Sequence, residues 1–139
     1  MILSLTMIAG DRCPLLADAL ASARPFADEL VVVHTGSEQD TPRIAKDQGA
    51  RVLSSPWRND FAQARNVSLQ AARGDWIFVL DSDEVVVNPD SVLRCRPLLE
   101  ADEVDALLVR LRCPYRGGEE ELVAPRLFRN HPVLRYERA

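Results

Sequence analysis

The regular alternation of β-rich and helical segments constrains the fold of this chain more than any other feature of its sequence. The β-rich runs are residues 2–8, 30–33, 51–53 and 76–80. A segment with helical periodicity follows each run, and these segments cover residues 14–23, 41–48, 60–72 and 88–101. Strands that alternate with helices predict an α/β fold, with a mostly parallel sheet and helices on both of its faces.

The last part of the sequence has a different pattern. From Val104 onward, two β-rich stretches flank the pair Gly117–Gly118, which is typical of a turn between antiparallel strands. We therefore expect a C-terminal β meander after the α/β part. A length of 139 residues suits one domain with a real core, and is short for two.

Composition narrows the classes of partner. The formal net charge is −4 and there is no basic run, which argues against nucleic acid as the main partner. No stretch approaches the roughly 18 to 20 apolar residues of a membrane span, and the apolar N-terminus is interpreted as a first strand and not as a signal peptide. The three cysteines lack C-x-x-C spacing, which favours reduced thiols and a cytoplasmic location.

An acidic cluster follows the last of the four β-rich runs directly, in the order Asp81, Ser82, Asp83 and Glu84. Open parallel sheets bind ligands beyond the carboxyl ends of their strands. Carboxylates at that place are hard oxygen donors suited to Mg²⁺ or Mn²⁺, and such an ion takes its remaining ligands from water and substrate phosphates. The D-x-D spacing taken alone fits a solvated acidic turn equally well.

Four stretches taken together are more specific than the acidic cluster: ILSLTMIAGDR, DELVVVHTGSEQDTPRIAKDQGARV, WRNDFAQARNVSLQAARGDWIFVLDSDE and PRLFRN. In order and spacing they resemble the bacterial family 2 glycosyltransferases. The resemblance covers almost the whole chain. It implies a Rossmann-like GT-A fold, with the nucleotide-binding part in residues 1–103 and the first acceptor-side strands in residues 104–139. It also implies an inverting transfer of a sugar from a nucleotide-diphosphate sugar, in most members a UDP-sugar.

The resemblance also implies a set of site residues. Asp83 would coordinate the Mg²⁺ or Mn²⁺ ion that bridges the diphosphate, and Asp81 would lie close to the ion, the ribose and the nucleotide. The residues implied for binding the nucleotide sugar are His34, Gly36, Ser37, Asp60, Arg65, Asn66, Asp81 and Ser82. Several of them also have structural interpretations, because Asp60 suits a helix cap and Asn66 suits a hydrogen bond to backbone. Trp57 suits either the core or a pocket wall.

Three departures from the family pattern bear on function. Residues 10–12 are Gly-Asp-Arg where the family usually has Lys-Asn-Glu, and His34 replaces an Asp that reads the base in related enzymes. The family normally continues beyond the stretch RLFRNHPVLRYE, and its general base lies in that continuation. The chain therefore looks truncated, its catalytic residue is unknown, and Glu84 is a weak local candidate. An end on a strand would leave a pairing edge, which a second copy could cover as a homodimer.

Two functions from different classes remain open. One is a metal-dependent glycosyltransferase that acts on an unidentified glycan, lipid or protein acceptor. The other is a catalytically incomplete nucleotide-sugar-binding or assembly module, which the missing C-terminal segment and His34 favour. A nucleotidyltransferase on a similar fold is a weaker alternative, because residues 9–14 lack a Gly-rich loop with Arg and Lys.

Overall fold

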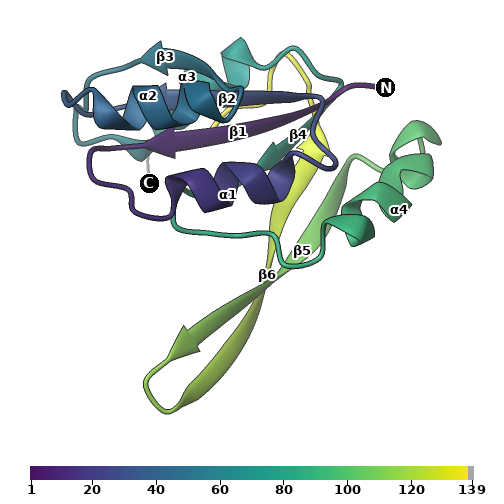
Figure 1. Ribbon diagram of the computed structural model, residues 1–139. Coiled ribbons are helices and arrows are strands. Elements are labelled where there is room, and N and C mark those ends of the chain that lie inside the picture. Colours follow the sequence, from purple (N-terminus) through teal and green to yellow (C-terminus); the bar gives the residue numbers. More distant parts are fainter. Residues whose placement is uncertain (138–139) are drawn as a thin grey trace.

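The computed structural model describes residues 1–137 (Figure 1). Arg138 and Ala139 lie outside the described residues. The elements follow one another in this order: β1 (Leu3–Ala9), α1 (Leu16–Ala23), β2 (Glu29–His34), α2 (Asp40–Asp47), β3 (Arg51–Ser54), α3 (Phe61–Ala71), β4 (Trp76–Val79), α4 (Pro89–Glu100), β5 (Ala106–Tyr115) and β6 (Gly118–Arg129).

The strands form one mixed sheet in the order β3-β2-β1-β4-β6-β5. β1 to β4 run parallel, whereas β6 is antiparallel to both β4 and β5. This arrangement confirms the predicted α/β fold. It differs from a simple meander in one detail, because the second strand of the hairpin, and not the first, lies against β4. The strand order reverses between β1 and β4, and ligand crevices form at such switch points.

Both faces of the sheet are covered, because successive residues of a strand point to opposite sides. On one face, side chains of β1 and β4 pack against α1, α2 and α4, and Figure 1 shows α1 and α2 side by side there. The α1 stripe predicted from the sequence is fully buried: Leu16, Ala19, Leu20 and Ala23. On the other face, Ile77 and Val79 of β4 pack with Leu69 of α3.

β5 and β6 form a long hairpin that projects from the body of the molecule (Figure 1). Only Leu127 to Arg129 of β6 pair with β4. The turn falls at Gly117, whose φ of 120° lies in the region that favours glycine. The boundary predicted at residues 103–104 falls between α4 and β5, and the functional division at that point remains a prediction.

Residues 130–137 correct one expectation. β6 ends at Arg129, and the segment after it contains turns and no strand. Asn130 anchors the segment, since its N–H donates to the carbonyl of Asp75 at 2.8 Å and its side chain donates to the carbonyl of Gly74 at 2.8 Å. Pro132 has no N–H to contribute to a sheet. Among residues 1–137, no helix is both long and apolar enough to cross a membrane.

Candidate functional site

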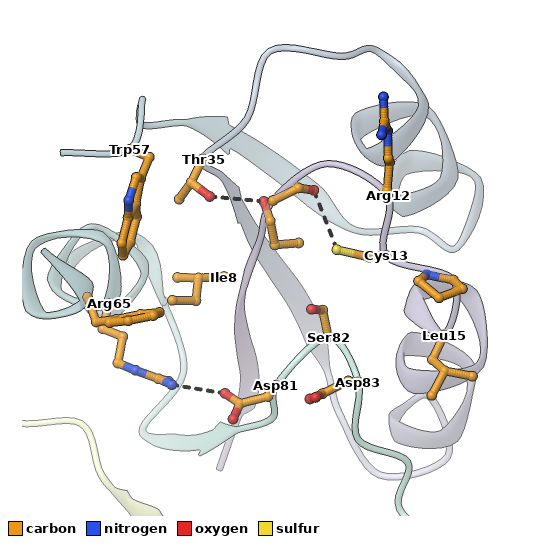
Figure 2. Close-up of a pocket in the computed structure, with 14 residues that line it drawn as sticks. Ile8, Arg12, Cys13, Leu15, Thr35, Trp57, Arg65, Asp81, Ser82 and Asp83 are labelled. Carbon is orange, nitrogen blue, oxygen red and sulfur yellow. Dashed lines mark hydrogen bonds and ion pairs between the residues drawn. The ribbon is translucent and has the colours of Figure 1, made fainter. Parts of the chain in front are cut away.

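A pocket of about 510 Å³ opens at the switch point of the sheet (Figure 2). Its walls come from the end of β1 and the loop that leads from it to α1, the turns that follow β2 and β4, the loop between β3 and α3, and α3 itself. Four residues of the predicted site line it: Arg65, Asp81, Ser82 and Asp83. The pocket also has lining residues that the sequence did not assign to the site, among them Arg12, Leu15 and Phe61.

The two carboxylates of the acidic turn have different surroundings. Asp81 is half-buried; its Oδ1 accepts a hydrogen bond from Arg65 Nη2 at 3.0 Å, and its Oδ2 lies 3.7 Å from Arg126 Nη2. Asp83 is exposed, and no side chain among residues 1–137 forms a hydrogen bond or ion pair with it. Two arginines therefore neutralise Asp81, whereas the oxygens of Asp83 are available to a cation in the pocket.

Arg126 of β6 holds the acidic turn from behind. Its guanidinium donates to both oxygens of Glu84, at 2.8 and 3.1 Å, and to the carbonyl of Val79 at 3.2 Å. Burial lowers the pKa of Arg126, but the hydrogen bond and charge of Glu84 outweigh that effect and raise the pKa above its ordinary value. Both carboxylate oxygens of Glu84, the weak catalytic candidate, are thus engaged in the ion pair with Arg126. This geometry does not present it as a general base.

Asp11 fills the turn that follows β2. Its carboxylate accepts the N–H groups of Ser37 and Glu38, both at 3.0 Å, and lies 2.9 Å from Nε2 of His34. The N–H of Ser37 and then the imidazole of His34 lower the pKa of Asp11. A Cβ on Gly36 would lie 2.2 to 2.5 Å from this carboxylate, so the close approach requires glycine.

Three predicted nucleotide contacts are therefore not among the residues that line the pocket. His34 is buried, and His34, Gly36 and Ser37 all face Asp11 and do not line the cavity. Two departures from the family pattern account for this, because Asp11 supplies a carboxylate next to the imidazole of His34. The pairing joins residues 23 positions apart, so no local pattern in the sequence could predict it.

Asp60 and Asn66 also have structural partners. Asp60 caps α3, and its Oδ1 accepts the N–H of Gln63 at 3.3 Å. Asn66 donates to the carbonyl of Tyr136 at 2.9 Å and accepts its N–H at 2.7 Å. Arg65 lies between them in sequence and reaches Asp81 instead, with its guanidinium 5.5 Å from the ring of Tyr136. Asn66 thus fastens residues 130–137 to α3.

Two aromatic side chains stand at the pocket. Trp57 and Phe61 meet edge to face, with ring centroids 4.7 Å apart and an interplanar angle of 67°. Trp57 is 42% exposed and Phe61 is 65% exposed. Trp57 is therefore a pocket wall, which was one of the two interpretations that the sequence left open.

The comparison with known families decides how this pocket is classified. The family described as "Glycosyl transferase family 2" matches residues 4–137, which include the pocket and the hairpin. The chain belongs to glycosyl transferase family 2. This confirms the resemblance on which the sequence interpretation rested.

The curated relatives that this chain matches are longer than the chain itself. A TPR repeat-containing protein of Synechococcus elongatus is 41% identical over 135 residues, which are 97% of this chain and 33% of that protein. An uncharacterized glycosyltransferase of Rickettsia prowazekii is 30% identical over 115 residues, which are 81% of this chain and 38% of that protein. The chain thus spans little more than a third of the length of these curated relatives.

A solved structure supports the GT-A fold. Glucosyl-3-phosphoglycerate synthase from Mycobacterium tuberculosis, in complex with Mn²⁺ and uridine-diphosphate-glucose, is 29% identical and superposes with a TM-score of 0.60. The match covers 75% of this chain and 41% of that chain. The fold of this family 2 member is therefore that of a protein seen with a metal ion and a nucleotide sugar.

The residues of this pocket fit a divalent ion only if ligands from outside the protein complete its coordination. Among residues 1–137, no three His, Cys, Asp or Glu side chains gather to hold a metal ion by themselves. Mg²⁺ and Mn²⁺ accept a site with one or two carboxylates when water and phosphate oxygens complete the coordination. Asp83 meets that requirement, since it is exposed and lines the pocket.

Proposed function

We propose that this chain is the donor-binding part of a metal-dependent glycosyltransferase, which transfers a sugar with inversion from a nucleotide-diphosphate sugar, with UDP as the nucleotide that we expect. The observation that carries the proposal is Asp83, which lines a pocket at the switch point of the sheet and has no ion-pair partner among the described residues 1–137. Its surroundings favour a ligand that brings both a cation and an anion, because Arg65 and Arg12 also line the cavity.

The residues of the pocket have distinct parts in this proposal. Asp83 would hold Mg²⁺ or Mn²⁺, which neutralises the charge of the departing diphosphate when bound. Asp81 keeps free lone pairs despite its two arginines, and suits a hydroxyl of the nucleotide ribose. Ser82 lies between the two carboxylates and offers a hydroxyl to the same ligand. Arg65 orients Asp81 from α3.

The remaining predicted residues shape the pocket from behind. His34, Gly36 and Ser37 hold Asp11 and fix the turn after β2. Asp60 fixes the start of α3, and Asn66 fixes its contact with residues 130–137. We propose for these five residues an indirect part in binding, through the positions of the walls that the nucleotide contacts.

The locked carboxylate of Glu84 favours a second candidate function. An inverting transfer needs a general base for the acceptor hydroxyl. Glu84 is held by Arg126, and Asp81 and Asp83 are the carboxylates that line the pocket. If the base comes from outside these residues, the chain acts alone as a nucleotide-sugar-binding or assembly module. Homodimerisation and a cytoplasmic location, which the unpaired Cys13, Cys95 and Cys113 favour, remain proposals.

Isothermal calorimetry tests the proposal. UDP is titrated into wild type, Asp83→Ala and Asp83→Asn, with and without Mn²⁺. We expect binding that requires Mn²⁺ in wild type, and a loss of at least about 100-fold in both variants, because second-shell changes alone cost 10- to 100-fold in metal affinity. The melting temperature should stay unchanged, since Asp83 has no hydrogen-bond or ion-pair partner in the part of the chain that the structure describes. Glu120→Gln on the exposed hairpin is the matched control. Metal-independent binding, or equal binding by Asp83→Ala, would contradict the proposal.

A further inference from the structure

Trp57 is held rigidly although a large part of it faces solvent. Its backbone N–H donates to the carbonyl of Thr35 at 3.0 Å, and its indole Nε1 donates to Asn59 Oδ1 at 3.0 Å. Asn59 has a φ of 56°, a left-handed conformation that asparagine adopts more readily than most residues. Phe61 packs on the ring edge to face. The indole is thus fixed in position with 42% of the residue exposed.

A rigid and exposed indole in a concave pocket is suited to a planar ligand. Aromatic side chains gain stability from burial, so leaving two of them exposed at one place points to a partner that covers them. Trp57 and Phe61 both line the pocket that contains the acidic turn. Figure 2 shows Trp57 and Asp83 on opposite sides of this pocket.

Trp57 is joined to the turn after β2 by the hydrogen bond from its N–H to the carbonyl of Thr35, and backbone donors of that turn are already satisfied within the protein. Asp11 accepts the N–H groups of Ser37 and Glu38 and pairs with Nε2 of His34. This end of the pocket therefore offers few free hydrogen-bond donors from the turn after β2. What it does offer is the face of an aromatic ring.

We propose that Trp57 is the stacking surface for the nucleobase of the donor. The proposal rests on the proposed function, because it uses Asp83 as the end of the pocket that takes the diphosphate. In an extended nucleotide the base lies away from the diphosphate, at the side where Trp57 stands. Stacking accepts every base, since every base has a π-face. With the turn donors occupied by Asp11, discrimination between bases at this site is weak.

Intrinsic fluorescence gives a direct readout of Trp57. The chain has two tryptophans, and the other, Trp76, is completely buried in the core. Addition of UDP with Mn²⁺ should change the wild-type emission and protect it from acrylamide. Trp57→Phe should lose this response while it keeps UDP binding by calorimetry. A UDP-bound wild-type protein whose emission and quenching are unchanged would overturn the proposal.

Binding affinities for UDP and for pyrophosphate then separate contacts to the base from contacts to the diphosphate. Trp57→Ala should weaken UDP·Mn²⁺ binding about 30-fold, the middle of the range for loss of one base-stacking contact, and should leave pyrophosphate·Mn²⁺ binding unchanged. Trp57→Phe should restore most of the UDP affinity, which a purely structural effect would not do. Tyr115→Ala, which removes a more exposed aromatic residue from the hairpin, should change the binding of neither ligand. ADP and GDP should bind wild type within about tenfold of UDP, in line with sequence-tolerant stacking.

The other outcomes overturn the proposal. Equal weakening of UDP and pyrophosphate by Trp57→Ala would mean that Trp57 supports the pocket and does not contact the base. An effect on UDP-glucose with none on UDP would make it a platform for the sugar. A preference for UDP of much more than tenfold would show hydrogen-bonded base reading in place of stacking. Absence of any metal-dependent nucleotide binding in wild type would overturn the proposed function as well, whereas the other three results leave it standing.

Discussion

At the amino ends of the parallel strands, carboxylates are surrounded by donors from the protein, whereas Asp83 at the carboxyl ends has none within residues 1–137. Glu29 accepts hydrogen bonds from Ser4 Oγ at 2.6 Å and from the N–H of Arg73 at 2.5 Å, and Arg51 lies 3.4 Å away. Asp83 is exposed and lacks a side-chain partner among residues 1–137. Both residues are negative charges at strand ends, so charge alone does not separate them.

The difference lies in what each carboxylate is paired with. Asp28 accepts the N–H of Leu3 at 2.8 Å and pairs with Arg96, and Asp75 accepts the N–H of Ile2 at 2.8 Å. Together with Glu29, these acids close the ends of strands and thereby stabilise the fold. A carboxylate with no such partner contributes little to the fold and is available to a ligand. The carboxylates at the amino end are therefore structural, and the carboxyl end is where we propose that the ligand binds.

The ion pair between Arg126 and Glu84 is the strongest test of this difference between the two ends, because it is a structural pair that lies at the carboxyl end. Replacing Arg126 with Ala leaves Glu84 without its partner, and loss of one member of a buried ion pair costs about 3 kcal/mol at the lower end of the usual range. We take that lower end because Glu84 is 25% exposed and Arg126 is 18% exposed. Urea unfolding at pH 7 measures the loss. Arg126→Leu with Glu84→Leu should recover most of it, since no unpaired charge then remains. A loss below about 1 kcal/mol for Arg126→Ala, as for a surface pair, would contradict the assignment.

Glu29→Gln should separate the two ends with a smaller effect. The substitution removes the charge and leaves one amide group among donors, which should lower the free energy of unfolding by about 1–2 kcal/mol. Binding of UDP·Mn²⁺ should not change, because Glu29 lies at the opposite end of the strands from the pocket. Glu38→Gln is the matched control, since its ion pair with Arg12 is exposed and should contribute less than about 0.5 kcal/mol. Weaker nucleotide binding by Glu29→Gln would contradict the assignment of a purely structural part to the amino end.

The sequence predicted the helices and strands because their signals are local. The α1 stripe, the prolines near helix starts and the turn at Gly117 all act within a few residues. The position of the acidic turn at the pocket followed from the same alternation. The family resemblance added Arg65, which the structure brings to Asp81.

The pairings across the chain were beyond prediction from local patterns. Arg126 meets Glu84 across 42 residues, and Asn66 meets Tyr136 across 70. In each case another interpretation of the side chain fits the sequence equally well, and only tertiary packing selects the partner. The insertion of β6 between β4 and β5 has the same origin, because hairpin strands carry no local sign of which one joins the sheet.

The smallest effect we predict is the acid dependence of the amino end. Burial raises the pKa of Glu29, but hydrogen bonds from Ser4, Arg73 and Arg51 outweigh it and hold the pKa below its ordinary value of 4.5. A carboxyl whose pKa is lowered in the folded state stabilises the protein at pH values above its ordinary, unfolded-state pKa. This contribution is lost as the pH falls through the folded-state pKa. The difference in unfolding free energy between wild type and Glu29→Gln should therefore be constant from pH 7 to about 5 and narrow below 4.5. Asp11→Asn provides the comparison, because the difference in unfolding free energy between this variant and wild type should narrow only below pH 3.8, the ordinary pKa of the Asp11 carboxyl. A gap for Glu29→Gln that widens on acidification would show that burial, and not hydrogen bonding, dominates the pKa of Glu29.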